Sequence, residues 1–297
     1  MTAITVRAPA KINLFLRIVG RRTDGYHLLQ MLNVPLQLAD TLFIESPALA
    51  NYGAKSCFAR DGISLVCEHP EVPLDETNLC YRAAEAMRAA AARCESVRIA
   101  IEKQIPIGGG LGGGSSDVAA VLCGLNHLWQ LGWPPTRLAE IGVRIGADVP
   151  FFCLGQPAMV EGIGEQVTLC RSFPKTWILL VNPRIQISTP WAYQQYDLGL
   201  TASTPHVSSL PRFLERFEDV AALVGNDLES VVANRYPVVR EMIGALRQSG
   251  AAAAGMTGSG STVFGLFATR ERRDSAVRAY AGSGWLVIPT ESVDSGA

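Results

Sequence analysis

The chain has 297 residues, of which 48% are hydrophobic and 18% are charged, a balance that excludes a disordered or coiled-coil protein. At this length one large domain or two small ones can bury a substantial core without disulfides or metals. The 26 basic and 27 acidic residues give a net charge of −1, which argues against a general polyanion-binding protein, so we expect no nucleic-acid partner.

The seven cysteines are odd in number and include no C-x-x-C pair. This pattern argues against zinc knuckles, redox pairs and a disulfide framework, and it predicts buried thiols in a reducing cytosol. The N-terminal residues lack a basic segment followed by an apolar one, and no apolar run reaches the length of about 18 residues that a membrane span needs. We therefore expect a cytoplasmic protein without a membrane partner.

The periodicity of apolar residues predicts the elements in chain order. Alternation over 12–18 indicates a first strand that carries Lys11 and Asn13 on its polar face, and a polar turn follows at 21–25. Further strands are expected at 41–45, 97–101, 177–181, 263–267 and 285–288. Helices are expected at 78–93, from about 115 to 131, and at 136–145, 227–234, 237–249 and 270–281.

Three segments give no element: 46–76 is uninformative, 201–210 is typical of a loop, and 250–262 is typical of a small-residue turn. Because strands and helices mix without a regular βαβ period, the pattern favours an α+β fold over a doubly wound sheet.

The sharpest feature is the glycine-rich run 106–116, Pro-Ile-Gly-Gly-Gly-Leu-Gly-Gly-Gly-Ser-Ser, between a predicted strand and a predicted helix. Without Cβ atoms, successive backbone N–H groups can converge on an anion, and the start of a helix adds its own unpaired N–H groups. A flexible connector is the structural alternative, but linkers seldom lie between a strand and a helix. The run therefore predicts a phosphate site.

Two familiar phosphate loops fit the run poorly. A Walker A loop requires a lysine that is absent here. Gly108, Gly110 and Gly113 match G-x-G-x-x-G, but 127–136 contains neither the acid nor the strand that a dinucleotide site requires.

The glycine-rich run resembles the second signature of the GHMP small-molecule kinases, which include galactokinase and the homoserine, mevalonate and phosphomevalonate kinases. The segment 8–16, Ala-Pro-Ala-Lys-Ile-Asn-Leu-Phe-Leu, resembles the first family motif. The segment 255–264, Gly-Met-Thr-Gly-Ser-Gly-Ser-Thr-Val-Phe, resembles the third. The resemblance implies a two-lobed α+β GHMP kinase fold, with an N-terminal lobe at 1–160, a C-terminal lobe at 161–297 and the active site in the cleft between the lobes. It also implies that ATP, accompanied by Mg²⁺, phosphorylates an alcohol.

The segments 24–30, Asp-Gly-Tyr-His-Leu-Leu-Gln, and 146–152, Gly-Ala-Asp-Val-Pro-Phe-Phe, resemble one branch of this family. In that branch ATP phosphorylates the 2-hydroxyl of a cytidylylated methylerythritol, in the non-mevalonate route to isoprenoid precursors. The resemblance thus implies a small-molecule substrate that bears a cytidine diphosphate. Another alcohol kinase of the family, a silent nucleotide-binding protein and a nicotinamide oxidoreductase are the alternatives, and the oligomeric state, with a homodimer as one option, stays open.

Phosphoryl transfer to an alcohol requires a group that orients the hydroxyl and accepts its proton. Asp148 follows a predicted helix in an apolar setting, where a carboxylate is desolvated or paired with a cation; a helix cap or a turn aspartate is the structural alternative. Lys11, taken alone, is an ordinary strand lysine. The resemblance implies that Lys11 and Asp148 form the catalytic pair and that Asn13 orients the acceptor or Lys11.

The resemblance also implies binding roles for further residues. Tyr26, His27 and Tyr193 would recognise the cytidine, and Thr189 would contact the substrate phosphates. Asn78 and Lys103 match positions that line the adenine pocket. The expected phosphate cradle consists of Pro106, Gly108, Gly109, Gly110, Leu111, Gly112, Gly113, Gly114, Ser115 and Ser116.

Two points stay open in the sequence. No cluster of carboxylates identifies a protein ligand for the metal, so the metal ligands stay unassigned. Asp117 directly follows the serines, where a carboxylate near a triphosphate is repulsive unless it faces a helix N-terminus or a metal, and its role stays open.

Overall fold

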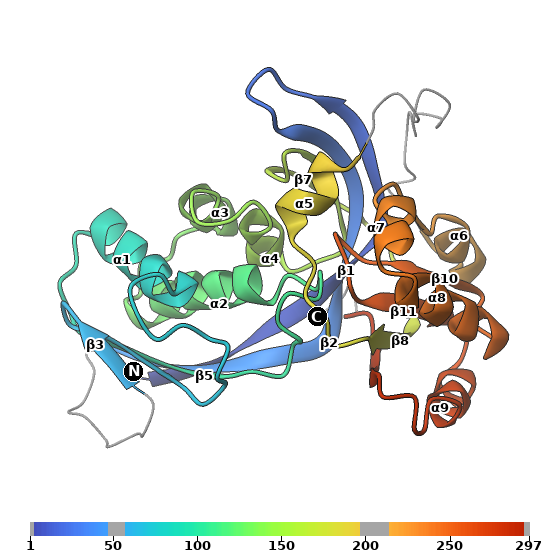
Figure 1. Cartoon of the computed structure of the whole chain (residues 1–297). Coiled ribbons are helices and arrows are strands. Elements are labelled where there is room, and N and C mark those ends of the chain that lie inside the picture. The colour runs from blue at the N-terminus through green and yellow to red at the C-terminus, as the bar shows by residue number, and fades with distance from the viewer. Residues whose placement is uncertain (1–2, 47–56, 197–213, 294–297) are drawn as a thin grey trace. The chain divides into compact units, whose positions relative to one another are not determined.

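The computed structural model describes residues 3–46, 57–196 and 214–293, and the chain divides into two compact units (Figure 1). Unit 1 comprises Met1–Ala10, Leu38–Ile107 and Gly112–Gly155. Unit 2 comprises Lys11–Gln37, Gly108–Leu111 and Gln156–Ala297. Both units mix helices and sheet, which confirms the α+β class; the lobes 1–160 and 161–297 stay a prediction.

The sheet of unit 1 is built on the C-terminal half of β2 (His27–Glu45), which pairs antiparallel with β5 (Val97–Glu102). Strand β5 pairs parallel with β4 (Ile63–Cys67), and β4 pairs antiparallel with β3 (Cys57–Arg60). The segment 46–76, which gave no sequence signal, thus contains a hairpin. Its strands are short, and alternation over four or five residues is weak against the polar residues around it.

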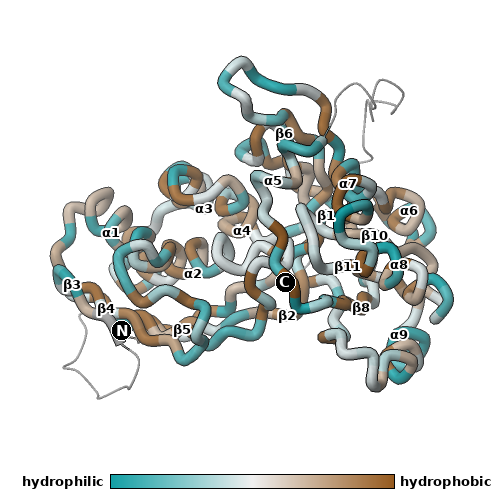
Figure 2. The backbone as a smooth tube through the Cα atoms, in the orientation of Figure 1, coloured by the Kyte–Doolittle hydropathy of each residue, from teal (hydrophilic) through white to brown (hydrophobic). Residues whose placement is uncertain are grey.

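Four helices belong to unit 1: α1 (Leu79–Ala91), α2 (Gly113–Leu128), α3 (Pro135–Gly142) and α4 (Val149–Leu154). Helix α2 packs closely on the sheet, since a Cβ on Gly124 would lie 2.6 Å from Ile44 Cδ1 and 3.2 Å from Val6 Cγ2. Hydrophobic stretches recur along the strands and along α2 (Figure 2). The helix predicted at 136–145 is shorter than expected, and α4 gave no sequence signal of its own.

In unit 2 the N-terminal half of β2 pairs with β6 (Ala158–Gly162), which pairs with β7 (Gln166–Leu169). The C-terminal part of β1 (Ala3–Arg21) pairs parallel with the short β9 (Gly225–Asn226). The pairing of β1 with β9 places the first sequence motif beside residues 225–226, which are about 210 positions later in the chain.

A second sheet in unit 2 has the order β10 (Ala253–Met256), β11 (Val263–Phe267), β8 (Trp177–Asn182) and β12 (Leu286–Glu291), with every pair antiparallel. Helix α8 (Val238–Gln248) packs on β10 and β11. The other helices of unit 2 are α5 (Thr189–Gln194), α6 (Phe217–Ala222), α7 (Glu229–Arg235) and α9 (Arg270–Arg278).

Several predicted elements are confirmed and others are corrected. Strand 263–267 has the predicted bounds, but the predicted turn 250–262 contains strand β10. The prediction of a loop at 201–210 lies outside the described residues. Among the described residues, no helix combines the length and the apolar character that crossing a bilayer requires.

Two expectations about burial were wrong. Lys11 and Asn13, predicted on a polar strand face, are only 4% and 1% exposed, because both faces of this part of β1 are covered. Cys94 is exposed, since it lies in the turn after α1 rather than in the core. The other free thiols that the structure describes are buried or half-buried.

Candidate functional site

Three sequence motifs that lie far apart in the chain meet in unit 2. The backbone N–H of Lys11 donates to the carbonyl of Leu111, in the glycine-rich run, at 2.9 Å. The backbone N–H of Asn13 donates to Thr257 Oγ1, in the third motif, at 2.9 Å. The same stretch of β1 therefore contacts both glycine-rich segments.

The two glycine-rich segments also contact each other directly. A Cβ on Gly110, whose φ is +77°, would overlap the carbonyl oxygen of Thr257, and a Cβ on Gly258 would lie 3.1 Å from the carbonyl oxygen of Gly110. The N–H of Thr262 donates to the carbonyl of Gly109 at 3.3 Å. Glycine is required here for close backbone approach as well as for conformation.

A buried chain of polar side chains orients Lys11. Lys11 Nζ donates to Asn13 Oδ1 at 2.6 Å, and Asn13 Nδ2 donates to Asn33 Oδ1 at 2.6 Å. Asn33 is fully buried on β2. Sequence reasoning missed Asn33, because an asparagine inside an apolar strand has no motif around it.

An aromatic group lies at another part of unit 2. The rings of His27 and Tyr193 stack at a centroid separation of 5.2 Å and an interplanar angle of 30°, and Tyr196 contributes an edge contact to His27 at 6.4 Å. Burial, together with the charge of Arg21, lowers the pKa of His27, so the imidazole is neutral at pH 7. Tyr26 is 62% exposed, which leaves its ring open to solvent.

The structure shows a group of hydrogen bonds around Asn226 and Asp227 that the sequence did not reveal. Asp227 accepts from Arg17 Nη1 and from the backbone N–H of Ile18, both at 2.8 Å, and from the Tyr196 hydroxyl at 3.4 Å. Its neighbour Asn226 donates to the carbonyls of Met256 and Gly258 at 2.9 and 2.8 Å. In the sequence, Asn226 and Asp227 stand at the start of the helix predicted at 227–234. They indicate an ordinary helix cap and no further role.

Thr189, predicted to contact substrate phosphates, lies at the start of α5. Its hydroxyl is 2.7 Å from the hydroxyl of Ser259 in the third motif. Unit 2 thus holds together Lys11, Asn13, Thr189, the tip of the glycine-rich run and, at the aromatic group, His27 and Tyr193.

In unit 1 the rest of the glycine-rich run forms the start of α2. The helix begins at Gly113, two residues before the predicted start, with Gly112 in the left-handed conformation at φ +73°. The first N–H groups of a helix have no partner within it. Ser116 is 1% exposed, and its hydroxyl has no hydrogen-bond partner among the described residues. Unpaired N–H groups and an orphaned hydroxyl fit the phosphates of ATP.

Asp148 occupies the residue before α4, but its side chain does not cap that helix. Its turn lies close to the glycine-rich run, since a Cβ on Gly146 would be 3.1 Å from Ser115 Oγ. The alternative of a capping aspartate is therefore not supported, whereas the alternative of a turn aspartate stays open because Asp148 lies in a turn. The pairing of Asp148 with Lys11 stays a prediction.

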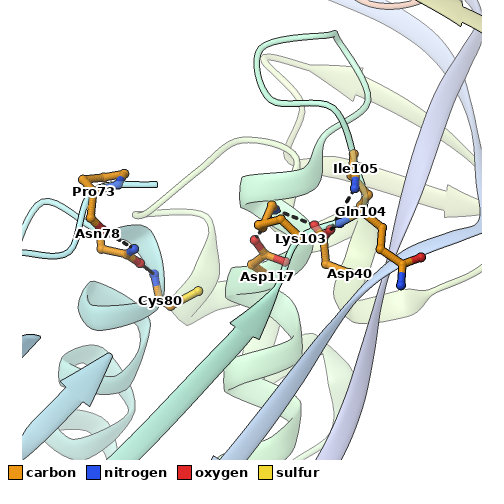
Figure 3. Close-up of polar contacts among 8 residues, drawn as sticks. All are labelled: Asp40, Pro73, Asn78, Cys80, Lys103, Gln104, Ile105 and Asp117. Atoms are coloured by element: carbon orange, nitrogen blue, oxygen red, sulfur yellow. Dashed lines mark hydrogen bonds and ion pairs between the residues drawn. The ribbon is translucent and has the colours of Figure 1, made fainter. Parts of the chain in front are cut away.

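The two residues predicted to line the adenine pocket have polar contacts within unit 1 (Figure 3). Asn78 caps α1 by accepting from the N–H of Cys80 at 2.8 Å, and it donates to the carbonyl of Pro73 at 2.7 Å. Lys103 Nζ lies between the carboxylates of Asp40 and Asp117. Their adenine contacts stay a prediction.

The part of the chain that the structure describes contains no group of three or more His, Cys, Asp or Glu side chains arranged to hold a metal ion.

Comparison with known proteins decides the family. Residues 78–156 match the GHMP kinases N terminal domain, and residues 208–284 match the GHMP kinases C terminal domain. A 4-diphosphocytidyl-2-C-methyl-D-erythritol kinase from Geobacter sulfurreducens is 45% identical over 280 residues, 94% of each chain. The chain belongs to the GHMP kinase family. A second relative of this GHMP kinase, with the same name and from Geobacter metallireducens, is 42% identical over 99% of this chain and 100% of its own.

Solved structures agree with this assignment. A crystal structure of 4-(cytidine 5'-diphospho)-2C-methyl-D-erythritol kinase is similar to this GHMP kinase with a TM-score of 0.79 and 32% identity, covering 97% of this chain and 99% of the other. Homoserine kinase from Cytophaga hutchinsonii has a TM-score of 0.71 at 14% identity, over 99% of this chain and 95% of its own, and supports the fold alone.

Proposed function

We propose that this GHMP kinase phosphorylates the 2-hydroxyl of 4-diphosphocytidyl-2-C-methyl-D-erythritol with ATP, giving the 2-phosphate and ADP, in the non-mevalonate route to isoprenoid precursors. The observation that carries the proposal is the stack of His27 on Tyr193 in the same unit as Lys11. An aromatic pair offers a surface on which a cytosine can stack, whereas mevalonate and homoserine have no ring to stack. The names of the full-length relatives support the same substrate.

The proposed mechanism assigns each group one task. The N–H groups at the start of α2 and the hydroxyls of Ser115 and Ser116 hold the phosphates, since a helix N-terminus favours negative charge. Lys11, oriented by Asn13, stabilises charge on the acceptor oxygen or the transferred phosphoryl group. Asp148 accepts the proton of the hydroxyl. ATP supplies the phosphoryl group, and Mg²⁺ offsets the charge of its phosphates.

Aromatic stacking and the third motif position the other end of the substrate. His27 and Tyr193 hold the cytosine, and the exposed ring of Tyr26 is next to His27 in the sequence. Thr189, fixed by Ser259, contacts the substrate phosphates. We also infer a cytoplasmic location and leave a homodimer as a prediction for mass measurement in solution.

Release of ADP from purified protein with ATP and Mg²⁺ tests the proposal, with the cytidylylated methylerythritol compared against mevalonate, homoserine and galactose. We expect turnover with the cytidylylated alcohol alone. Turnover with another alcohol would keep the kinase and reject the cytidine site. ATP binding without turnover on any of the four would reject the proposed substrate.

A further inference from the structure

Three ionisable side chains meet next to the start of α2, all within unit 1 (Figure 3). Lys103 Nζ lies 2.5 Å from Asp40 Oδ2 and 2.7 Å from Asp117 Oδ2. The side chains of Lys103, Asp40 and Asp117 are 6%, 0% and 7% exposed, and we refer to them as the buried triad. When both buried carboxylates are ionised, the single ammonium leaves one negative charge in excess. Burying an uncompensated charge costs stability.

The buried triad connects the residues that precede the glycine-rich run with the helix that follows it. Asp40 Oδ1 accepts the N–H groups of Gln104 and Ile105, at 2.6 and 2.9 Å, just before the run begins. Asp117 lies on α2, directly after the two serines. A Cβ on Gly113, the first residue of α2, would lie 3.2 Å from Ile105 Cγ2 and 3.5 Å from Asp40 Oδ2. Lys103 therefore links both ends of the run.

Burial disfavours the charged form of the Asp117 carboxyl. Burial raises the pKa of Asp117 to about 7, an effect that Lys103 opposes and Asp40 reinforces. Asp117 Oδ1 has no hydrogen-bond partner among the described residues. Burial raises the pKa of the Cys67 and Cys80 thiols, which also interact electrostatically with the buried triad. A neutral side chain would fill this position with less penalty, which indicates a role beyond packing.

We propose that Asp40 and Asp117 are positioning residues for ATP: through Lys103 they hold the start of α2, with its first N–H groups and the hydroxyls of Ser115 and Ser116, in the arrangement that binds phosphate. This inference rests on the proposed ATP-binding role of the run. Neither carboxylate contacts the nucleotide; each acts through the backbone and through Lys103. The inference gives Asp117 the role that its sequence position left open.

The test is calorimetric titration of the purified protein with ATP in the presence of Mg²⁺ and without any alcohol. We compare Asp40→Asn, Asp117→Asn and the double variant with the wild type. We expect the Kd of ATP to rise about tenfold in each single variant, since small displacements of positioned groups have effects of this size or larger. Because both carboxylates act through Lys103, the double variant should fall short of the product of the single effects.

Two further comparisons separate positioning from general loosening. Glu45→Gln removes a half-buried ion pair with Arg98, 3.1 Å long, between β2, the strand that carries Asp40, and β5, and it should leave the Kd of ATP unchanged. The KM of the alcohol should stay within about twofold of wild type in the Asp40 and Asp117 variants, since the two carboxylates act on the start of α2, which is assigned to the nucleotide. Lys103→Arg should retain more ATP affinity than Lys103→Met.

Three results would overturn the inference. These are an ATP Kd within about twofold of wild type in folded single variants, a double variant equal to the product of the single effects, or equal rises in the Kd of ATP and the KM of the alcohol. If Asp40→Asn does not fold, Asp117→Asn decides alone. Since the titration contains no alcohol, its outcome holds even if the cytidylylated alcohol is not the substrate.

Discussion

Gly110 and Thr257 lie so close that a methyl group on Gly110 would overlap the carbonyl oxygen of Thr257. This contact joins the second and third family motifs backbone to backbone, with no side chain between them. The turn that follows β10 is rich in glycine, and this composition lets its backbone approach the backbone of Gly110. The contact also gives a direct test of the packing in unit 2.

Gly110→Ala should destabilise the protein by about 2–4 kcal/mol, because backbone strain at positive φ adds to overpacking. The matched control is Gly132→Ala, which has a φ of +63° against +77° but meets nothing within 4 Å. Urea unfolding measures both. If both variants lose the same free energy of unfolding, backbone strain accounts for the whole effect and the contact between Gly110 and Thr257 contributes nothing.

Asp148→Asn should lower kcat about 10²–10⁴-fold while the Kd of ATP stays near the wild-type value, because an amide cannot accept the proton of the hydroxyl. Single-turnover kinetics and an ATP titration measure the two quantities. A variant that keeps near-normal kcat would remove Asp148 as the base.

His27→Ala should raise the KM of the cytidylylated alcohol by about 5- to 150-fold and leave that of ATP unchanged, since one stacked base contributes about 1–3 kcal/mol. The control is His127→Ala, at an exposed position on α2. Steady-state kinetics with each substrate varied in turn provide the comparison. Parallel rises for both substrates would be incompatible with a cytidine site at His27 and Tyr193.

The stability of the protein should carry a pH dependence from Asp117. Its pKa is raised from 3.8 to about 7 in the folded state, so folding favours the protonated form. The contribution of this group is fully present below its unfolded pKa of about 4 and is lost as the pH rises through about 7. Asp117→Asn should therefore gain in Tm relative to wild type between pH 5 and pH 8, with Glu45→Gln as the control. A constant difference in Tm across that range would refute the buried ionisation.

Sequence patterning predicted the elements that are long or strongly periodic. Helix α1, strand β5 and strand β11 lie within two residues of their predicted bounds. It missed the hairpin β3–β4, and it missed β10 because its residues are mostly alanine and glycine, whose strand propensity is low. Local periodicity fails where pairing with a distant strand supplies the stability.

The predicted site residues came from motifs, whereas their partners did not. Asn33, Asp40 and Asp227 each hold a motif residue or a neighbour of one, yet each lies in another part of the sequence. Hydrogen bonds between segments so far apart depend on the folded arrangement of strands, which no spacing rule encodes. For the same reason Lys11 resembles a solvent-facing lysine in the sequence, although the folded structure buries it.

The two long strands at the start of the chain contribute residues to both compact units, and so does the glycine-rich run. A gene fragment that ends near residue 155 would lack most of unit 2 but would still encode its segments Lys11–Gln37 and Gly108–Leu111. The complementary fragment would begin without the strands that β6 and β9 pair with. Neither half is a self-contained module, so fragments of this enzyme are expected to regain activity only by reassembly with each other, and domain exchange with a relative must transfer three separate stretches at once.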